Sequence, residues 1–210
     1  MSTSVKPYHH GDLRAALVAA AVESLEAGES FSLRAVARRA GVSPTAPYRH
    51  FADREALDNA VAVEGFRDLL ADLEAASDRL PEAAAPQDVI TALGVAYVAF
   101  ALRRPAVFRL MFGNECDEAD SERVQAAGQL HGMLNRVFER LFPGNSGLSV
   151  ALWSMAHGLA FLHLDGKLPP QSNDGVAARV KLAVGAIFAL NNSKTTAGQV
   201  PAGPPEGEPA

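Results

Sequence analysis

The feature that most constrains this chain is the spacing of its apolar residues, which repeats with the period of a helix rather than that of a strand. No stretch alternates apolar and polar residues for more than a few positions, so no half-buried β-strand is indicated. Alanine, the residue with the highest helix propensity, occurs 39 times among 210 residues. The sequence predicts an all-α fold, with helices near 11–27, 33–40, 44–51, 54–79, 87–104, 105–112, 118–142, 147–166 and 174–192.

Charge divides the chain into two unlike parts. The formal net charge of −5 argues against a protein that coats DNA by bulk charge. Residues 1–52 hold six basic and four acidic side chains, a balance of +2, whereas residues 53–210 have a balance of −7. Together with the helix ranges, this predicts an N-terminal domain at 1–53, a second domain at 54–192 and a disordered tail rich in proline and glycine at 193–210.

Composition and motifs exclude several classes of protein. The single cysteine excludes a disulfide framework and a cysteine-based zinc cluster, and it fits a reducing cytosol. There is neither a secretory signal nor an uncharged run long enough to span a bilayer, so we expect a cytoplasmic protein with no membrane partner. Metal-ligand spacings, phosphate-binding glycine loops and catalytic serine motifs are also absent. We therefore predict no metal, no cofactor and no enzymatic activity.

A helix–turn–helix pattern occupies residues 31–51. Ser32 is suited to cap a short helix with apolar residues at positions i, i+3, i+4 and i+7. Gly41 follows at the place where a left-handed residue commonly ends a helix. Ser43 can cap the next helix, and Pro44 fits its first position, where a missing N–H costs nothing. Two short helices joined in this way can place the second one in a DNA major groove.

The second helix of this pattern carries side chains suited to DNA. Pro44, Thr45 and Ala46 present small or methyl-bearing surfaces that fit thymine methyl groups. Arg49 can reach guanine or a phosphate. Polar ends suited to phosphates belong to Tyr48, His50 and Arg54. The alternative, an ordinary packed helical hairpin, is less favoured because the second helix is poor in large apolar residues.

The segment from Tyr8 to Val63 resembles the DNA-binding head of the tetracycline-repressor (TetR) family. The diagnostic pattern is a Gly-Val turn, S-x-x-x-x-Y-x-x-F and a basic residue before E-x-L, formed here by Gly41, Val42, Ser43, Tyr48, Phe51, Arg54, Glu55 and Leu57. The resemblance implies base contacts by Pro44, Thr45, Ala46 and Arg49, and phosphate contacts by Ser32, Ser43, Tyr48, His50 and Arg54. Pro47 departs from the family, which often has an aliphatic residue there. Because Pro47 cannot donate to the Ser43 carbonyl, we expect a tight or slightly kinked helix.

The last two predicted helices, 147–166 and 174–192, are apolar on nearly all sides. In a body of six helices, core burial on one face leaves a second apolar face unexplained. A four-helix interface with two helices from each subunit accounts for it, and a central helix pair in a monomer is the alternative. The resemblance to the TetR family implies a homodimer through these same helices.

A W-x-x-x-H-G pattern lies within the predicted helix at 147–166. Trp153 and His157 share a helix face, and Gly158 lets another backbone or a ligand approach. The pattern resembles the signature of one class of TetR C-terminal domain. His157 can line a ligand pocket or be a core histidine, and the sequence leaves both open. The candidate pocket residues, each of which can also be core, are Phe100, Phe108, Met111, Phe112, Met133, Trp153, Met155, His157 and Phe161.

These patterns together predict a dimeric, ligand-responsive transcription regulator, in its simplest form a repressor. The expected partners are a palindromic operator in double-stranded DNA and a small, largely apolar effector that releases the protein from it. The predicted helix at 54–79 joins the two domains, so an effector is expected to act by moving the DNA-binding heads. The alternatives are an effector-independent DNA-binding protein and, less favoured, an all-helical enzyme.

Overall fold

The computed structural model describes residues 13–29, 32–113, 121–169 and 172–197. Across these residues it has eight α-helices, one short 3₁₀ helix and no strand, so the predicted all-α fold class is confirmed. The elements are α1 (Leu13–Glu26), α2 (Leu33–Arg39), the 3₁₀ helix η1 (Pro47–Arg49), α3 (Arg54–Asp78), α4 (Pro86–Arg103), α5 (Pro105–Gly113), α6 (Ser121–Leu141), α7 (Ser146–Leu164) and α8 (Asn173–Ala197).

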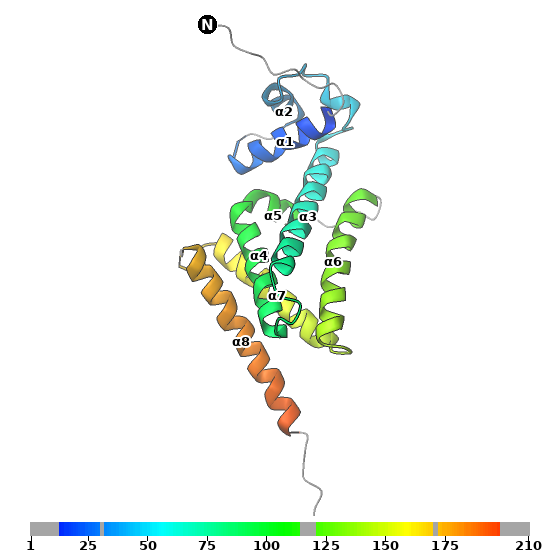
Figure 1. Cartoon of the computed structure of the whole chain (residues 1–210). Helices are drawn as coiled ribbons and strands as arrows, with labels where there is room; N and C mark the ends of the chain where they lie inside the picture. Colours follow the sequence, from blue (N-terminus) through cyan, green and yellow to red (C-terminus); the bar gives the residue numbers. More distant parts are fainter. Residues whose placement is uncertain (1–12, 30–31, 114–120, 170–171, 198–210) are drawn as a thin grey trace, which may run out of the picture.

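The helices form a small head and a larger body that share one long helix (Figure 1). The head contains α1, α2 and η1, and α3 runs from the head into the body. In the body, α3 packs against α4, α5 and α6, while α4 also packs against α7 and α8. The helix α8 lies at the edge of the body, away from the head (Figure 1). One helix therefore carries contacts from both parts of the molecule.

Local sequence explains how the head folds. The Ser32 hydroxyl accepts a hydrogen bond from the Ala35 N–H at 3.1 Å and caps α2. Gly41 ends this helix with a positive φ of 71°, a conformation that costs glycine little. Asp53 caps α3 by accepting from the Ala56 N–H at 2.9 Å. The fully buried Val36 belongs to the same apolar cluster as residues of α3, so the caps fix helices that the core then holds together.

The predicted helix at 44–51 differs from the observed structure. Only Pro47–Arg49 is helical, and it is a 3₁₀ helix. Most backbone hydrogen bonds in this segment join residues three apart, with the Ala46 N–H donating to the Ser43 carbonyl at 3.0 Å and the His50 N–H donating to the Pro47 carbonyl at 2.9 Å. Only the bond at its end, from the Phe51 N–H to the Pro47 carbonyl at 2.9 Å, joins residues four apart. Pro47 has no N–H to complete the bond to Ser43 that an α-helix requires. The segment is therefore tighter than an α-helix as far as His50, and not only at its start.

Helix α8 also differs from the expected range. It continues to Ala197, five residues beyond the predicted end at 192. The first five residues of the predicted tail at 193–210 are thus helical, and residues 198–210 lie outside the part of the chain that the structure describes.

Helices α4 and α5 form a sharp corner that brings α5 against α3. Their axes are bent by 105° at Arg104, where Pro105 opens the new helix. Gly65 of α3 faces α5: a Cβ atom built on it would lie 2.6 Å from the Met111 sulfur and 2.7 Å from Val107 Cγ1. The absence of a side chain at position 65 is therefore what allows the two helices to approach so closely.

Helix α7 is the most apolar of the long helices. Among the described helices taken singly, it alone has the length and composition to cross a membrane, which is weak support for a membrane protein. Val150 and Leu162 on α7 are 60% and 43% exposed in the single chain. Much of the apolar surface of α7 is thus left without a partner within one chain.

We predict that Gly65→Ala destabilises the protein by about 1–3 kcal/mol, because Met111 is buried and cannot move away from the added methyl group. Gly128→Ala in α6 is the matched control, since a Cβ there meets nothing within 4 Å. It should stabilise the protein by about 0.5–1 kcal/mol through helix propensity. Urea unfolding of the two variants is the measurement, and equal midpoints would contradict the close α3–α5 contact.

Candidate nucleic-acid interface and ligand site

The segment that follows the turn at Gly41 presents its polar side chains outward. Pro47 is buried and takes the supporting role that an aliphatic residue would have. Tyr48 is 51% exposed, although it is a large aromatic residue. The other exposed residues of this segment are Ser43, Pro44, Thr45, Arg49 and His50, while Ala46 is half-buried. The structure thus places six of the nine residues predicted to contact DNA on the solvent side of one short turn.

Two of the predicted phosphate-binding side chains also have structural roles. The Ser32 hydroxyl is engaged in capping α2. Arg54 forms an ion pair with Asp58, 3.5 Å from Nε to the carboxylate, yet its side chain remains 62% exposed. Burial raises the pKa of Asp58, and the Arg54 charge opposes that rise. Arg54 can therefore exchange this carboxylate for a phosphate with little rearrangement of α3.

One arginine side chain on α2 forms ion pairs within the head, and the other two are exposed to solvent. Arg39 forms ion pairs with Glu29 and with Glu23, and hydrogen bonding to Glu29 raises the pKa of Arg39. Arg34 and Arg38 are exposed on the same helix. The predicted list of DNA contacts omits these two residues, and the only signal for them is their position before the turn.

A candidate ligand site, separate from the exposed turn of the head, lies inside the body at His157 of α7. The His157 Nδ1 is 2.8 Å from the hydroxyl oxygen of Tyr97 in α4. Burial raises the pKa of Tyr97, and the nearby Trp153 side chain opposes that rise. Trp153 and His157, which the sequence placed on one helix face, therefore both lie beside a tyrosine from another helix.

The direction of the Tyr97–His157 hydrogen bond depends on the imidazole tautomer. When the Tyr97 hydroxyl donates to Nδ1, the proton of the neutral imidazole is on Nε2. Burial lowers the pKa of His157 and favours the neutral imidazole. In this tautomer the Nε2–H is a donor on an otherwise apolar helix face.

Aromatic rings surround His157 on its other sides. The ring centroids of Phe112 and Phe161 lie 4.8 and 4.9 Å from that of His157, and the centroid of Phe108 lies 5.8 Å away. Trp153 is 5.8 Å away on the same helix. The structure thus brings together five of the predicted pocket residues. We call these five residues the aromatic cluster.

The remaining predicted pocket residues lie apart from His157. Phe100 and Met111 are fully buried behind the aromatic cluster, with Met111 against Gly65. Met133 is on α6, beside a surface groove that also involves the C-terminal end of α3. Met155 lines a cavity of about 30 Å³ with Tyr97 and Trp153. That cavity has room for about one water molecule, so an effector needs the surrounding helices to move.

Sequence reasoning missed Tyr97, Glu26 and Arg123. Nothing in the predicted helix at 87–104 distinguishes Tyr97 from its apolar neighbours. Glu26 did carry a signal, since it is a carboxylate at the C-terminal end of α1, where the helix dipole disfavours negative charge. Among the described residues, no group of three or more His, Cys, Asp or Glu side chains is placed to hold a metal ion.

An outward-facing helix–turn–helix on a helical body defines the class of a helix–turn–helix DNA-binding regulator. Residues 17–61 match the family model "Bacterial regulatory proteins, tetR family", and residues 90–186 match "Tetracyclin repressor-like, C-terminal domain". The chain therefore belongs to the TetR family of transcriptional regulators, whose members bind DNA and are not enzymes.

Individual relatives agree with this assignment. A protein of unknown function from Rhodococcus sp. RHA1 is 35% identical, with a TM-score of 0.73 over 86% of this chain and 97% of that one. A regulatory protein of the tetR family from Rhodococcus RHA1 is 22% identical, with a TM-score of 0.62 over 84% and 97% of the two chains. An uncharacterized HTH-type transcriptional regulator from Haemophilus influenzae is 28% identical over 86% of this chain and 93% of the relative.

We predict that the free energy of unfolding falls as the pH drops below about 6.5, the ordinary pKa of histidine. The folded-state pKa of His157 is lowered, so the unfolded chain takes up the proton first and stability is lost until the folded-state pKa is reached. His163 acts in the same direction, because burial and Arg179 lower its pKa.

The comparison with His157→Gln isolates the contribution of His157. Urea unfolding of both proteins at about pH 7.5 and about pH 5.5 gives the pH dependence of stability, and the dependence should be weaker in the variant. An equally steep dependence in both proteins would show that His157 keeps an ordinary pKa in the fold.

Proposed function

We propose that this protein is a dimeric, sequence-specific regulator, a repressor that a small, largely apolar effector releases from a palindromic operator. Residues 1–53 are the DNA-binding domain and residues 54–192 the effector-binding and dimerisation domain. The observation that carries the proposal is the outward-facing turn at residues 43–50, supported from beneath by buried Pro47. Its site of action is the cytoplasm, where operator DNA is found.

The proposed DNA contacts divide by chemistry. Base edges are read by Pro44, Thr45, Ala46 and Arg49, of which Ala46 is the least exposed. Phosphates are bound by Ser32, Ser43, Tyr48, His50 and Arg54. The Ser43 and Thr45 hydroxyls lie 3.2 Å apart, so a phosphate bound by one affects the orientation of the other.

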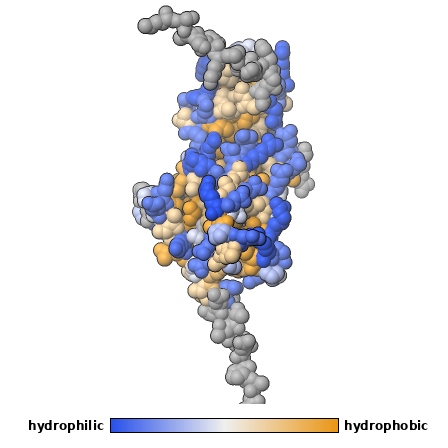
Figure 2. Space-filling model, in the orientation of Figure 1, coloured by the Kyte–Doolittle hydropathy of each residue, from blue (hydrophilic) through white to orange (hydrophobic). Residues whose placement is uncertain are grey.

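Apolar stripes on the last two helices support a homodimer. Leu182 and Leu190 on α8 are 75% and 70% exposed, and Ala178 and Ala186 continue the same face at a spacing of four residues. Hydrophobic side chains reach the surface along this edge of the body (Figure 2). A second copy of α7 and α8 would cover them in a four-helix interface, with the alanines permitting close approach.

The aromatic cluster around His157 is the proposed effector site. Its walls are apolar rings, and its proposed polar group is the Nε2–H that His157 carries when Nδ1 accepts from the Tyr97 hydroxyl. A matching effector is a small, flat, apolar molecule with one oxygen acceptor. Because the nearby cavity holds about 30 Å³, binding has to displace α5 or α7. The small cavity is also the observation that favours the second candidate function, an effector-independent DNA-binding protein.

Effector entry would act on DNA binding through the shared helix. Phe112 of α5 contacts Phe66 of α3, with ring centroids 5.5 Å apart, so a shift of α5 reaches α3 directly. In a dimer, movement of α3 changes the separation of the two heads, which needs to be about 34–36 Å for half-sites one helical turn apart. A coupling of about 1–3 kcal/mol would change operator affinity roughly 5–150-fold.

We predict that selection of bound DNA from a random pool enriches a palindrome, and that Arg49→Ala and Tyr48→Ala abolish the enrichment. Each variant removes an exposed side chain of the turn that makes no side-chain hydrogen bond or ion pair with the part of the chain that the structure describes. Arg79→Ala, an exposed arginine at the far end of α3, is the matched control and should select the wild-type sequence. Undiminished enrichment with Arg49→Ala and Tyr48→Ala would exclude this turn as the reading element.

We predict that Leu182→Glu converts the dimer to a monomer, because a charge in the proposed interface cannot be buried without a partner. Val124→Glu on α6 is the matched control, since Val124 is also an exposed apolar residue, 44% exposed, but lies away from α7 and α8. Sedimentation equilibrium gives the two masses. A monomeric wild-type protein, or a dimeric Leu182→Glu variant, would contradict the proposed interface.

A further inference from the structure

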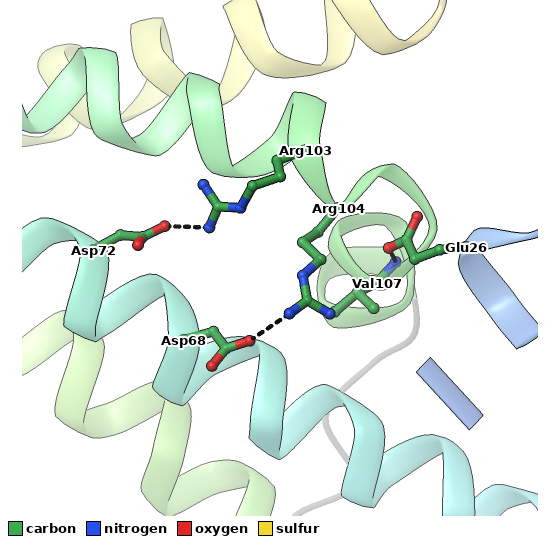
Figure 3. Close-up of polar contacts among 6 residues, drawn as sticks. All are labelled: Glu26, Asp68, Asp72, Arg103, Arg104 and Val107. Carbon is green, nitrogen blue, oxygen red and sulfur yellow. Dashed lines mark hydrogen bonds and ion pairs between the residues drawn. The ribbon is translucent and has the colours of Figure 1, made fainter. Parts of the chain in front are cut away.

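Helix α5 is capped at its N-terminus by a carboxylate from the head. The Ala106 N–H donates to one oxygen of Glu26 at 3.2 Å, and the Val107 N–H donates to the other at 3.0 Å (Figure 3). Pro105 has no N–H, and the Phe108 N–H donates to the Arg104 carbonyl at 2.8 Å. Every N–H group in the first turn of α5 is therefore satisfied, two of them by a side chain about 80 residues away in sequence.

Glu26 is an unfavourable residue for its own helix and a favourable one for α5. It lies in the last turn of α1, a turn without a basic residue, where its charge opposes the dipole of α1. The same charge lies at the positive end of α5. The residue preceding α5 cannot serve as a side-chain cap, because Arg104 is a cation and turns toward Asp68 of α3 (Figure 3). The interaction across the head–body junction thus replaces a local cap.

The opposite end of α5 is held by Arg123 of α6. This buried side chain donates from Nη2 to the Met111 carbonyl at 3.2 Å and from Nη1 to Asn59 Oδ1 in α3 at 2.8 Å. Arg123 therefore places a positive charge at the negative end of α5 and ties that end to the head-proximal part of α3. Between its two charged caps, α5 carries Phe108 and Phe112 of the aromatic cluster.

The head packs on the body through α1, which contacts both α3 and α5. Beside these contacts a cleft of about 570 Å³ opens along α1 and α3, lined by Val18 and Glu23 on one side and by Glu64 and Arg67 on the other. At the far end of α1, the Arg14–Glu122 ion pair is exposed and contributes little. The Glu26 contact is thus the half-buried polar connection that fixes α1 beside a cleft into which it can tilt.

We propose that Glu26 is a positioning residue that transmits the state of the aromatic cluster to the DNA-binding head through α5. When α5 shifts, the N–H groups of Ala106 and Val107 move with it, and Glu26 carries α1 along or loses its hydrogen bonds. With the contact intact, the head is held in one orientation; without it, the head tilts over the cleft. This inference rests on the ligand-responsive function proposed above.

The test uses hydrogen exchange of the full-length protein, with Glu26→Gln as the variant. A glutamine keeps the shape but brings an NH₂ group against one of the two N–H donors and removes the charge. Exchange at Ala106 and Val107, and along the last two turns of α1, should be about 5–30-fold faster than in the wild type. Asp72→Asn is the matched control: it removes the 2.6 Å Arg103–Asp72 ion pair, which joins two body helices and not the head (Figure 3).

A double-mutant cycle separates transmission from a local structural role. Phe112→Leu perturbs the aromatic cluster in place of an unidentified effector. As a single substitution, it should change the rate of amide hydrogen exchange in α1 relative to the wild type. In the Glu26→Gln background, the same substitution should change the exchange rate in α1 by less than about twofold, since the hydrogen bonds between Glu26 and α5 are already weakened or lost. Additive effects of the two substitutions, or a Glu26→Gln variant that exchanges like Asp72→Asn, would overturn the proposal.

Operator binding provides a second readout that separates this inference from the proposed function. With an operator from the DNA selection, Glu26→Gln should bind about 5–30-fold more weakly, because a head that tilts freely must be fixed on binding. Glu26→Asp, which keeps the charge on a shorter side chain, should lie between the wild type and Glu26→Gln. If Glu26→Gln binds the operator with wild-type affinity, the proposed role of Glu26 is refuted, but the proposed function of the protein is not. If the wild-type protein selects no operator, the proposed function is refuted. The double-mutant cycle measured by hydrogen exchange still tests the role of Glu26.

Discussion

Burial of α3 along nearly its whole length is the constraint on which the rest of the structure depends. Its apolar residues Leu57, Val61, Leu69 and Leu73 are fully buried, and they face the head at one end and the body at the other. A helix of 25 residues that is packed at both ends cannot bend without breaking contacts at one of them. Gly65 then lets α5 lie directly on α3, so the position of α5 is set by the same helix that positions the head.

Much of the fold was predictable because it is encoded locally. The caps at Ser32 and Asp53, the left-handed Gly41 and the helical period of the apolar residues are all sequence patterns with a direct backbone consequence. The error at residues 44–51 has a local cause as well. Pro47 was expected to tighten or slightly kink an α-helix, but the proline removes the bond to Ser43, and the only helix that forms is the 3₁₀ turn Pro47–Arg49.

The site in the body was only partly predictable, because its polar partners come from distant parts of the chain. Trp153 and His157 could be placed on one helix face from their spacing, but Tyr97, 60 residues from His157, has no pattern that connects it to them. Glu26 is similar, since it caps a helix that begins about 80 residues away in sequence, whereas Arg123 lies 12 residues from Met111 but on the next helix. Phe100 and Met111 are as apolar as Phe112, and only packing distinguishes the two fully buried residues from the one beside His157.

The 3₁₀ geometry of Pro47–Arg49 has a consequence for how DNA-sequence specificity can change in evolution. A 3₁₀ helix turns once every three residues, whereas an α-helix needs 3.6, so Tyr48 and Arg49 project in directions that an α-helical turn would not give them. The backbone around residue 47 therefore sets which atoms face the groove. Replacing Pro47 with a residue that donates an N–H would favour an α-helical turn and redirect the neighbouring side chains together. Under the proposed function, operator preference would then shift in a single evolutionary step, with every residue proposed to contact bases left unchanged.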